Sequence, residues 1–139
     1  MSKIDLIPRK LSIVNIDNAI FEYKKLLEDI PLTIEANSIF ELLNILKRKK
    51  INKGHYPNVT LFECANRIMT DLVVLYGVRM LLNGEFKEID FKEYDVEFGI
   101  ENKNSHDITA NDQNKNLKCE VFNVAGSFFQ TKKVKTGTQ

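Results

Sequence analysis

The chain has 139 residues, of which 43% are hydrophobic and 28% charged, so it is expected to form one globular domain rather than a disordered chain. Its two cysteines, Cys64 and Cys119, lack the short spacing of a zinc or redox motif and are predicted to be buried, reduced thiols. The sequence shows neither a signal peptide nor an apolar run long enough to span a bilayer, which predicts a cytoplasmic protein.

The formal net charge of +1 conceals two basic clusters, at residues 47–53 and 132–135. Such clusters leave nucleic acid open as a partner, although runs of charge more often form solvated faces. The average charge therefore does not exclude phosphate binding.

The first half of the chain predicts helices. Apolar residues recur at helical spacing over residues 16–30, and Pro31 ends that segment. Residues 38–41 and 60–63 are both capping boxes, in which Ser or Thr precedes Glu by three positions, and each should begin a helix. The helix from Thr60 should continue to Gly84, and because it is apolar around much of its circumference it is expected to be central and to pack against a sheet.

The second half predicts strands, because hydrophobic residues begin to alternate from Phe86 onward. The expected elements are a strand or hairpin over 86–100, a turn over 101–105, a strand over 106–110, a polar loop over 111–116 and an apolar strand over 117–125. The fold class predicted is α/β, bordering on α+β, with a helical N-terminal half packed on a small mixed or antiparallel sheet.

A third capping box at residues 127–130 predicts a final helix that carries Lys132, Lys133 and Lys135. Only about two turns would fit before the sequence ends. This suggests either a natural short tail or a chain cut before its last elements.

Two acidic residues are the strongest candidates for chemistry. Asp107 begins one predicted strand and Glu120 lies within the next, so antiparallel pairing would bring their carboxylates close together. Close carboxylates repel, and a hard cation such as Mg²⁺ relieves that repulsion. Strand parity also puts Glu120 on the same face as Phe122 and Val124, so it is expected to be an acid among apolar neighbours.

The order of these residues resembles the PD-(D/E)XK nuclease superfamily, which has the restriction-endonuclease-like fold. Four segments carry the resemblance. They are, in chain order, the predicted helix with Glu63, the segment His-Asp107-Ile-Thr-Ala, the segment Lys-Cys-Glu120-Val-Phe-Asn-Val-Ala and the predicted helix that follows. The resemblance covers about residues 60–136, so residues 60–139 would form an α-β-β-β-α nuclease-like core and residues 1–59 a helical extension of the same domain.

This resemblance implies an Mg²⁺- or Mn²⁺-dependent DNA endonuclease, in a bacterial defence setting and commonly dimeric. Asp107 and Glu120 would be metal ligands, and Glu63 a further ligand. The family's lysine should stand two residues after Glu120, where this chain has Phe122. Lys132 or Lys133 would then supply the catalytic lysine, with Lys118 as a weaker alternative.

Other readings of these residues stay open. Asp107 is also explained as a strand-entry aspartate bonded to backbone N–H groups, and Glu63 as part of the capping box. His55 and His106 are expected to be surface or hydrogen-bonded side chains rather than zinc ligands. The rival functions are a catalytically inactive relative that binds nucleic acid or protein, and an interaction domain with an exposed apolar stripe on the helix over 60–83.

Overall fold

The computed structural model describes residues 3–101, 106–122 and 131–138, the last range by its backbone. The helices are the 3₁₀ helix η1 (Lys3–Leu6), α1 (Ile16–Glu28), α2 (Ile39–Arg48) and α3 (Leu61–Leu82). The strands are β1 (Lys10–Ser12), β2 (Glu93–Val96), β3 (Ile108–Asn111), β4 (Lys115–Val121) and β5 (Thr131–Thr138).

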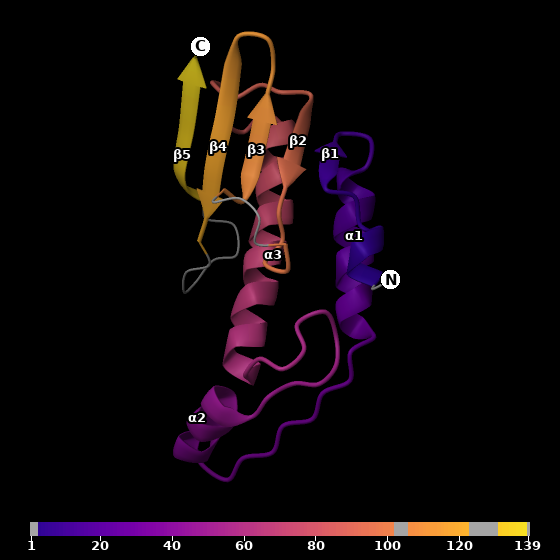
Figure 1. The fold of residues 1–139 in the computed structure, drawn as a ribbon, viewed down its shortest axis with the longest axis vertical. Coiled ribbons are helices and arrows are strands. Elements are labelled where there is room, and N and C mark those ends of the chain that lie inside the picture. Colours follow the sequence, from indigo (N-terminus) through magenta and orange to yellow (C-terminus); the bar gives the residue numbers. More distant parts are fainter. Residues whose placement is uncertain (1–2, 102–105, 123–130, 139) are drawn as a thin grey trace.

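The described strands form one five-stranded antiparallel sheet in the order β1-β2-β3-β4-β5. Figure 1 shows α3 running along one face of this sheet, with α1 beside it and α2 at the far end of the molecule. The predicted mixed α and β class is confirmed, and its topology is that of an α+β protein.

The three helices predicted in the first half of the chain are confirmed, and α2 and α3 begin with the predicted caps. Ser38 accepts a hydrogen bond from the backbone N–H of Glu41, and Thr60 accepts one from the backbone N–H of Glu63, each at 3.1 Å. These bonds satisfy backbone donors that the first turn of a helix leaves free. Gly84 follows α3 with a φ of 77°, a conformation that stops a helix at little cost for glycine.

The core joins the two halves of the chain. Side chains of α1 such as Tyr23 and of α3 such as Leu75 are fully buried together with Tyr94 and Leu117 of the sheet. β1 was not predicted, and it pairs with β2, so the segment expected to be a helical extension also contributes an edge strand to the sheet. Cys64 and Cys119 are free and buried, as expected.

The hypothesis of an interaction domain required an exposed apolar stripe along α3, and the described residues of α3 do not form one. Ten of its residues are buried, among them Val73, Val74 and Val78, and Phe62 is its exposed large hydrophobic side chain. None of the helices in the described part of the chain is long and apolar enough to cross a membrane.

One predicted element is wrong and another is confirmed only in part. Residues 131–138 form β5, paired along β4, where a helix was expected, while residues 127–130 of its capping box lie outside the described residues. The strand expected over 86–100 is confirmed only over β2, because Ile89 and Phe91 reach the core from irregular backbone. The predicted turn at 101–105 lies almost entirely outside the described residues.

Candidate functional site

Asp107 and Glu120 come near each other at one end of the β3–β4 hairpin. The last register pair of the two strands is Ile108 with Cys119, and Asp107 directly precedes β3. The backbone N–H of Asp107 donates to the carbonyl oxygen of Cys119 at 3.1 Å. Asp107 is therefore bonded to β4 next to Glu120, outside the regular strand pairing.

The Asp107 carboxylate is held by the backbone of the neighbouring strand. Its Oδ2 accepts a hydrogen bond from the N–H of Val121 at 3.1 Å. Burial raises the pKa of Asp107 above its usual value; the Val121 bond opposes that shift, and the negative charges of Glu120 and Glu97 add to it. The charge of Glu120 therefore acts on Asp107, although burial is the larger cause of the shift.

Glu120 lies on a more polar face than expected. The side chains of Ile108, Cys119 and Val121 are buried toward the core, whereas Glu120 is partly exposed on the opposite face with Lys118. Its Oε1 is 3.9 Å from Nδ1 of His106. Within β4, alternation puts the apolar residues on the other face from Glu120. Of the two apolar neighbours expected, Phe122 follows the strand and is 39% exposed, and Val124 lies outside the described residues.

The predicted lysines lie on β5. Lys132 pairs in register with Glu120, while Cys119 pairs with Val134, so Lys133 is the additional residue of a β-bulge at this point. Bulges often occur next to active sites, where they redirect side chains. The backbone register thus brings Asp107, Glu120 and Lys132 to one end of three neighbouring strands.

Glu63 lies on α3 rather than on the hairpin that carries Asp107 and Glu120. It lies in the first turn of α3, where its Oε1 accepts a hydrogen bond from Arg67 at 2.7 Å. Within the described ranges, no group of three or more His, Cys, Asp or Glu side chains is arranged to hold a metal ion. Capping and this ion pair account for Glu63 without a metal.

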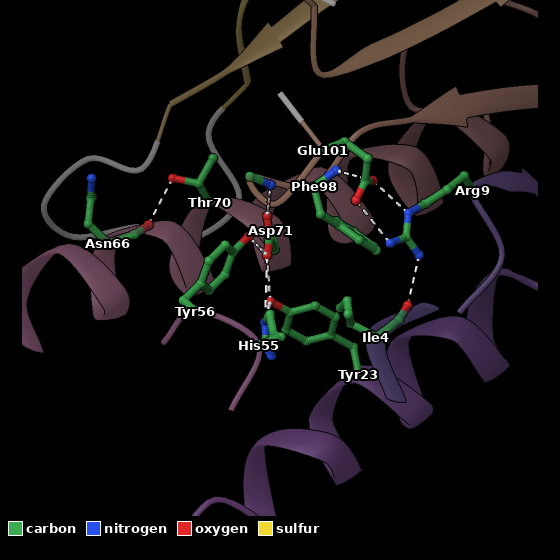
Figure 2. A network of polar contacts seen from close by, with 11 residues as sticks. Ile4, Arg9, Tyr23, His55, Tyr56, Asn66, Thr70, Asp71, Phe98 and Glu101 are labelled. Atoms are coloured by element: carbon green, nitrogen blue, oxygen red, sulfur yellow. Dashed lines mark hydrogen bonds and ion pairs between the residues drawn. The ribbon is translucent and has the colours of Figure 1, made fainter. Parts of the chain in front are cut away.

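A buried polar cluster, missed by sequence reasoning, connects four distant parts of the chain (Figure 2). Asp71 of α3 is fully buried, and its Oδ2 accepts hydrogen bonds from the hydroxyls of Tyr23 and Tyr56, both at 2.6 Å. Its Oδ1 accepts from the backbone N–H of Gly99 at 2.9 Å. The hydroxyl oxygen of Tyr23 is also 2.9 Å from Nε2 of His55. The prediction of a hydrogen-bonded His55 is confirmed.

The hydrogen bonds of Tyr23 determine which ring nitrogen of His55 carries the proton. The single hydroxyl proton of Tyr23 goes to the Asp71 carboxylate, so the Tyr23 oxygen accepts from His55, whose proton is therefore on Nε2. Burial, followed by the Arg9 charge, lowers the pKa of His55 to about 4, which keeps the ring neutral at pH 7. Nδ1 is then an acceptor, and it is buried without a hydrogen-bond partner among the residues that the structure describes.

The cluster also contains an acid with a shifted pKa. Burial raises the pKa of Asp71 to about 6, although the hydrogen bonds from Tyr23, Tyr56 and Gly99 oppose the shift. The pKa values of both tyrosines are raised well above their usual range, first by burial and then by the charge of Asp71. Because these hydroxyls keep their protons, the cluster is suited to holding elements together rather than to acid–base catalysis.

A cavity of about 520 Å³ adjoins this cluster, with His55, Tyr56, Arg67 and Gly99 among its lining residues. A Cβ atom at Gly99 would lie 2.8 Å from the Tyr56 hydroxyl oxygen, which is fixed by its bond to Asp71. Glycine at position 99 therefore allows the loop to approach the cluster and donate its backbone N–H.

The two shifted pKa values have opposite effects on stability. The raised pKa of Asp71 stabilises the fold at low pH, and this contribution is lost as the pH rises through about 6. The lowered pKa of His55 stabilises the fold above about pH 6.5, and this contribution is lost as the pH falls through about 4. In the unmodified protein the two contributions nearly cancel between pH 4 and 6.5.

Replacing His55 by Gln removes the contribution of the His55 pKa shift to stability and leaves that of Asp71. We expect the free energy of unfolding of His55→Gln, relative to the unmodified protein, to fall by about 3 kcal/mol as the pH rises from 4 to 6.5. Urea denaturation at intervals of half a pH unit measures this difference. A difference that stays constant across the window would contradict the assignment.

The chain was compared with protein-family models, curated proteins and solved structures, and it matches none of them. The resemblance to PD-(D/E)XK nucleases therefore stays a prediction based on the residues themselves.

Proposed function

We propose that this protein is a Mg²⁺-dependent DNA endonuclease, with its metal site at Asp107 and Glu120. The observation that supports the proposal is that Asp107 is bonded to Cys119 and Val121, the residues on either side of Glu120, at the end of the β3–β4 hairpin. Both acidic residues are partly exposed.

Two carboxylates are a ligand set that fits Mg²⁺ better than a metal ion whose ligands all come from the protein. Mg²⁺ is commonly bound by one or two carboxylates, with water and substrate phosphate completing its shell. Mn²⁺ accepts the same oxygen ligands. Burial is the largest cause of the raised pKa of Asp107, and the charges of Glu120 and Glu97 add to it. A divalent cation would relieve that added repulsion.

The reaction proposed is hydrolysis of a phosphodiester. A bound Mg²⁺ would lower the pKa of a coordinated water and neutralise charge that develops on the phosphoryl oxygens. The Val121 N–H keeps the Asp107 carboxylate in place for metal binding. Lys132, the register partner of Glu120, is proposed to orient the attacking water, whose oxygen bonds to phosphorus as one P–O ester bond breaks. The proton that this water loses balances the one taken up by the departing alkoxide.

Isothermal titration calorimetry with Mg²⁺ and Mn²⁺ tests the metal site. We expect binding by the unmodified protein and its loss in Asp107→Asn and Glu120→Gln, because each removes one of two anionic ligands. Asp107→Asn keeps an oxygen that can accept from Val121 N–H, so the hairpin should be preserved. The matched control is Asp95→Asn, an exposed carboxylate of β2 that pairs with Lys10. Equal binding by all four proteins would place the metal elsewhere.

A catalytically inactive relative is the second candidate, and Phe122 at the family's lysine position favours it. Metal binding without cleavage of any DNA would identify it. DNA as substrate, a homodimer, a cytoplasmic location and a role in bacterial defence belong to the main proposal as further expectations.

A further inference from the structure

The surface around α2 exposes more large apolar side chains than a protein normally leaves in water. None of the ten residues of α2 is buried, and Phe40, Ile39 and Leu43 are 75%, 73% and 53% exposed. Contiguous apolar surface of this kind usually marks an interaction site. Neighbouring exposed residues come from the preceding loop and from α3, namely Leu32, Ile34 and Phe62. We call these six residues the α2 surface.

An apolar groove lies between α2, α3 and the loops that connect them. It has a volume of about 340 Å³, and its lining includes Leu32 and Ile34 of the α2 surface. Leu46 of α2 and Ile68 and Met69 of α3 also line it. A concave apolar site of this size accepts side chains from a helix that lies along it. Figure 1 shows that α2 and its loops form the end of the molecule opposite the sheet, so this groove is separate from the proposed metal site.

The edge of the groove is strongly basic. Lys47, Arg48, Lys49, Lys50 and Lys53 follow one another at the end of α2 and in the next loop. Lys47 lies over the ring of Phe62, with its Nζ 4.5 Å from the ring centroid. No ion pair found among the described residues involves any of these five cations. Their charge is therefore available to an external partner.

We propose that this groove binds an acidic amphipathic helix of a partner protein. Apolar side chains of the partner would fill the groove, and its carboxylates would face the basic cluster. A second copy of this chain docked through the same surface would bring two basic clusters together, which electrostatic repulsion opposes. Single-stranded nucleic acid binds by stacking on aromatic rings, but most of the α2 surface is aliphatic and Lys47 covers the Phe62 ring.

Fluorescence anisotropy with two labelled 18-residue peptides tests this proposal. Both peptides have Leu at helical spacing on one face, and their other face carries Glu in one peptide and Lys in the other. We expect the Glu peptide to bind at least tenfold more tightly. Leu32→Ser and Ile34→Ser, which alter exposed residues that line the groove, should each weaken that binding at least tenfold. The double change Arg48→Glu with Lys49→Glu should remove most of the preference for the Glu peptide. Val14→Ser, which alters an 89% exposed side chain elsewhere, should change nothing.

Three results would overturn the proposal. The first is failure of the Glu peptide to bind at millimolar concentration, or equal binding of both peptides. The second is a concentration-dependent dimer in sedimentation equilibrium that Leu32→Ser abolishes, because the occupant would then be a second copy. The third is binding of a single-stranded oligonucleotide that competes with the Glu peptide and is lost in Leu32→Ser.

Discussion

Replacing Asp71 by Ala is expected to lower the free energy of unfolding by about 4 kcal/mol, a large share of the stability of a domain of this size. The change leaves two buried tyrosine hydroxyls and the Gly99 N–H without their acceptor. Each buried donor left unpaired costs about 1–3 kcal/mol. The bonds also join α1, α3 and two loops, so no single element can relax to restore them.

Urea denaturation followed by circular dichroism measures this loss. The control is Asp17→Ala, because the Asp17 carboxyl is 84% exposed and its ion pair with Arg79 is 4.0 Å long. Exposed pairs of this kind contribute less than about 1 kcal/mol. A loss of under 1 kcal/mol in Asp71→Ala would show that the cluster does not hold these elements together.

Replacing Lys132 by Ala is expected to lower the rate of DNA nicking by at least about a hundredfold while Mg²⁺ binding is retained. The proposed role of Lys132 is to orient the attacking water, and a group that positions or transfers a proton typically contributes 10²–10⁴-fold. Its β5 register opposite Glu120 is the reason for choosing it over the other lysines. Single-turnover nicking and calorimetry, carried out on the same preparation, separate the chemical step from metal binding.

The neighbouring lysines are the matched controls. Lys133→Ala alters the additional residue of the bulge, and Lys118→Ala alters an exposed residue of β4. Both should nick at close to the unmodified rate. A larger loss in either control than in Lys132→Ala would move the role to that lysine.

Local signals in the sequence were sufficient to predict α1, α2 and α3. The capping boxes at Ser38 and Thr60 describe bonds between residues three positions apart, so they do not depend on the rest of the fold. The same local pattern at 127–130 led to the wrong element for residues 131–138. These residues instead pair along the open edge of β4, and such long-range pairing outweighs a local preference.

The candidate site was partly accessible to the same reasoning. The short connection between the two strands explains why Asp107 bonds to Cys119 and Val121, the residues on either side of Glu120, while a shared metal stays a prediction. Within β4, the buried apolar residues alternate with Glu120, so the sequence did not show that its described neighbour on the same face is Lys118.

The Asp71 cluster could not be predicted, because its members come from positions 23, 55, 56, 71 and 99. One signal was present. Asp71 interrupts the apolar run from Ile68 to Val74 in a helix expected to be central, and a charge in such a place needs buried partners. The sequence does not say which partners those are.

Nicking of supercoiled plasmid DNA in the presence of Mg²⁺ or Mn²⁺ tests the central claim most directly. The assay compares the unmodified protein with Asp107→Asn, Glu120→Gln and the control Asp95→Asn, with chelator added to a parallel set. The account predicts metal-dependent conversion to nicked or linear plasmid by the unmodified protein and the control, and no conversion by the other two variants. Nicking that persists in Asp107→Asn and Glu120→Gln, or no nicking by the unmodified protein with either metal, would contradict it.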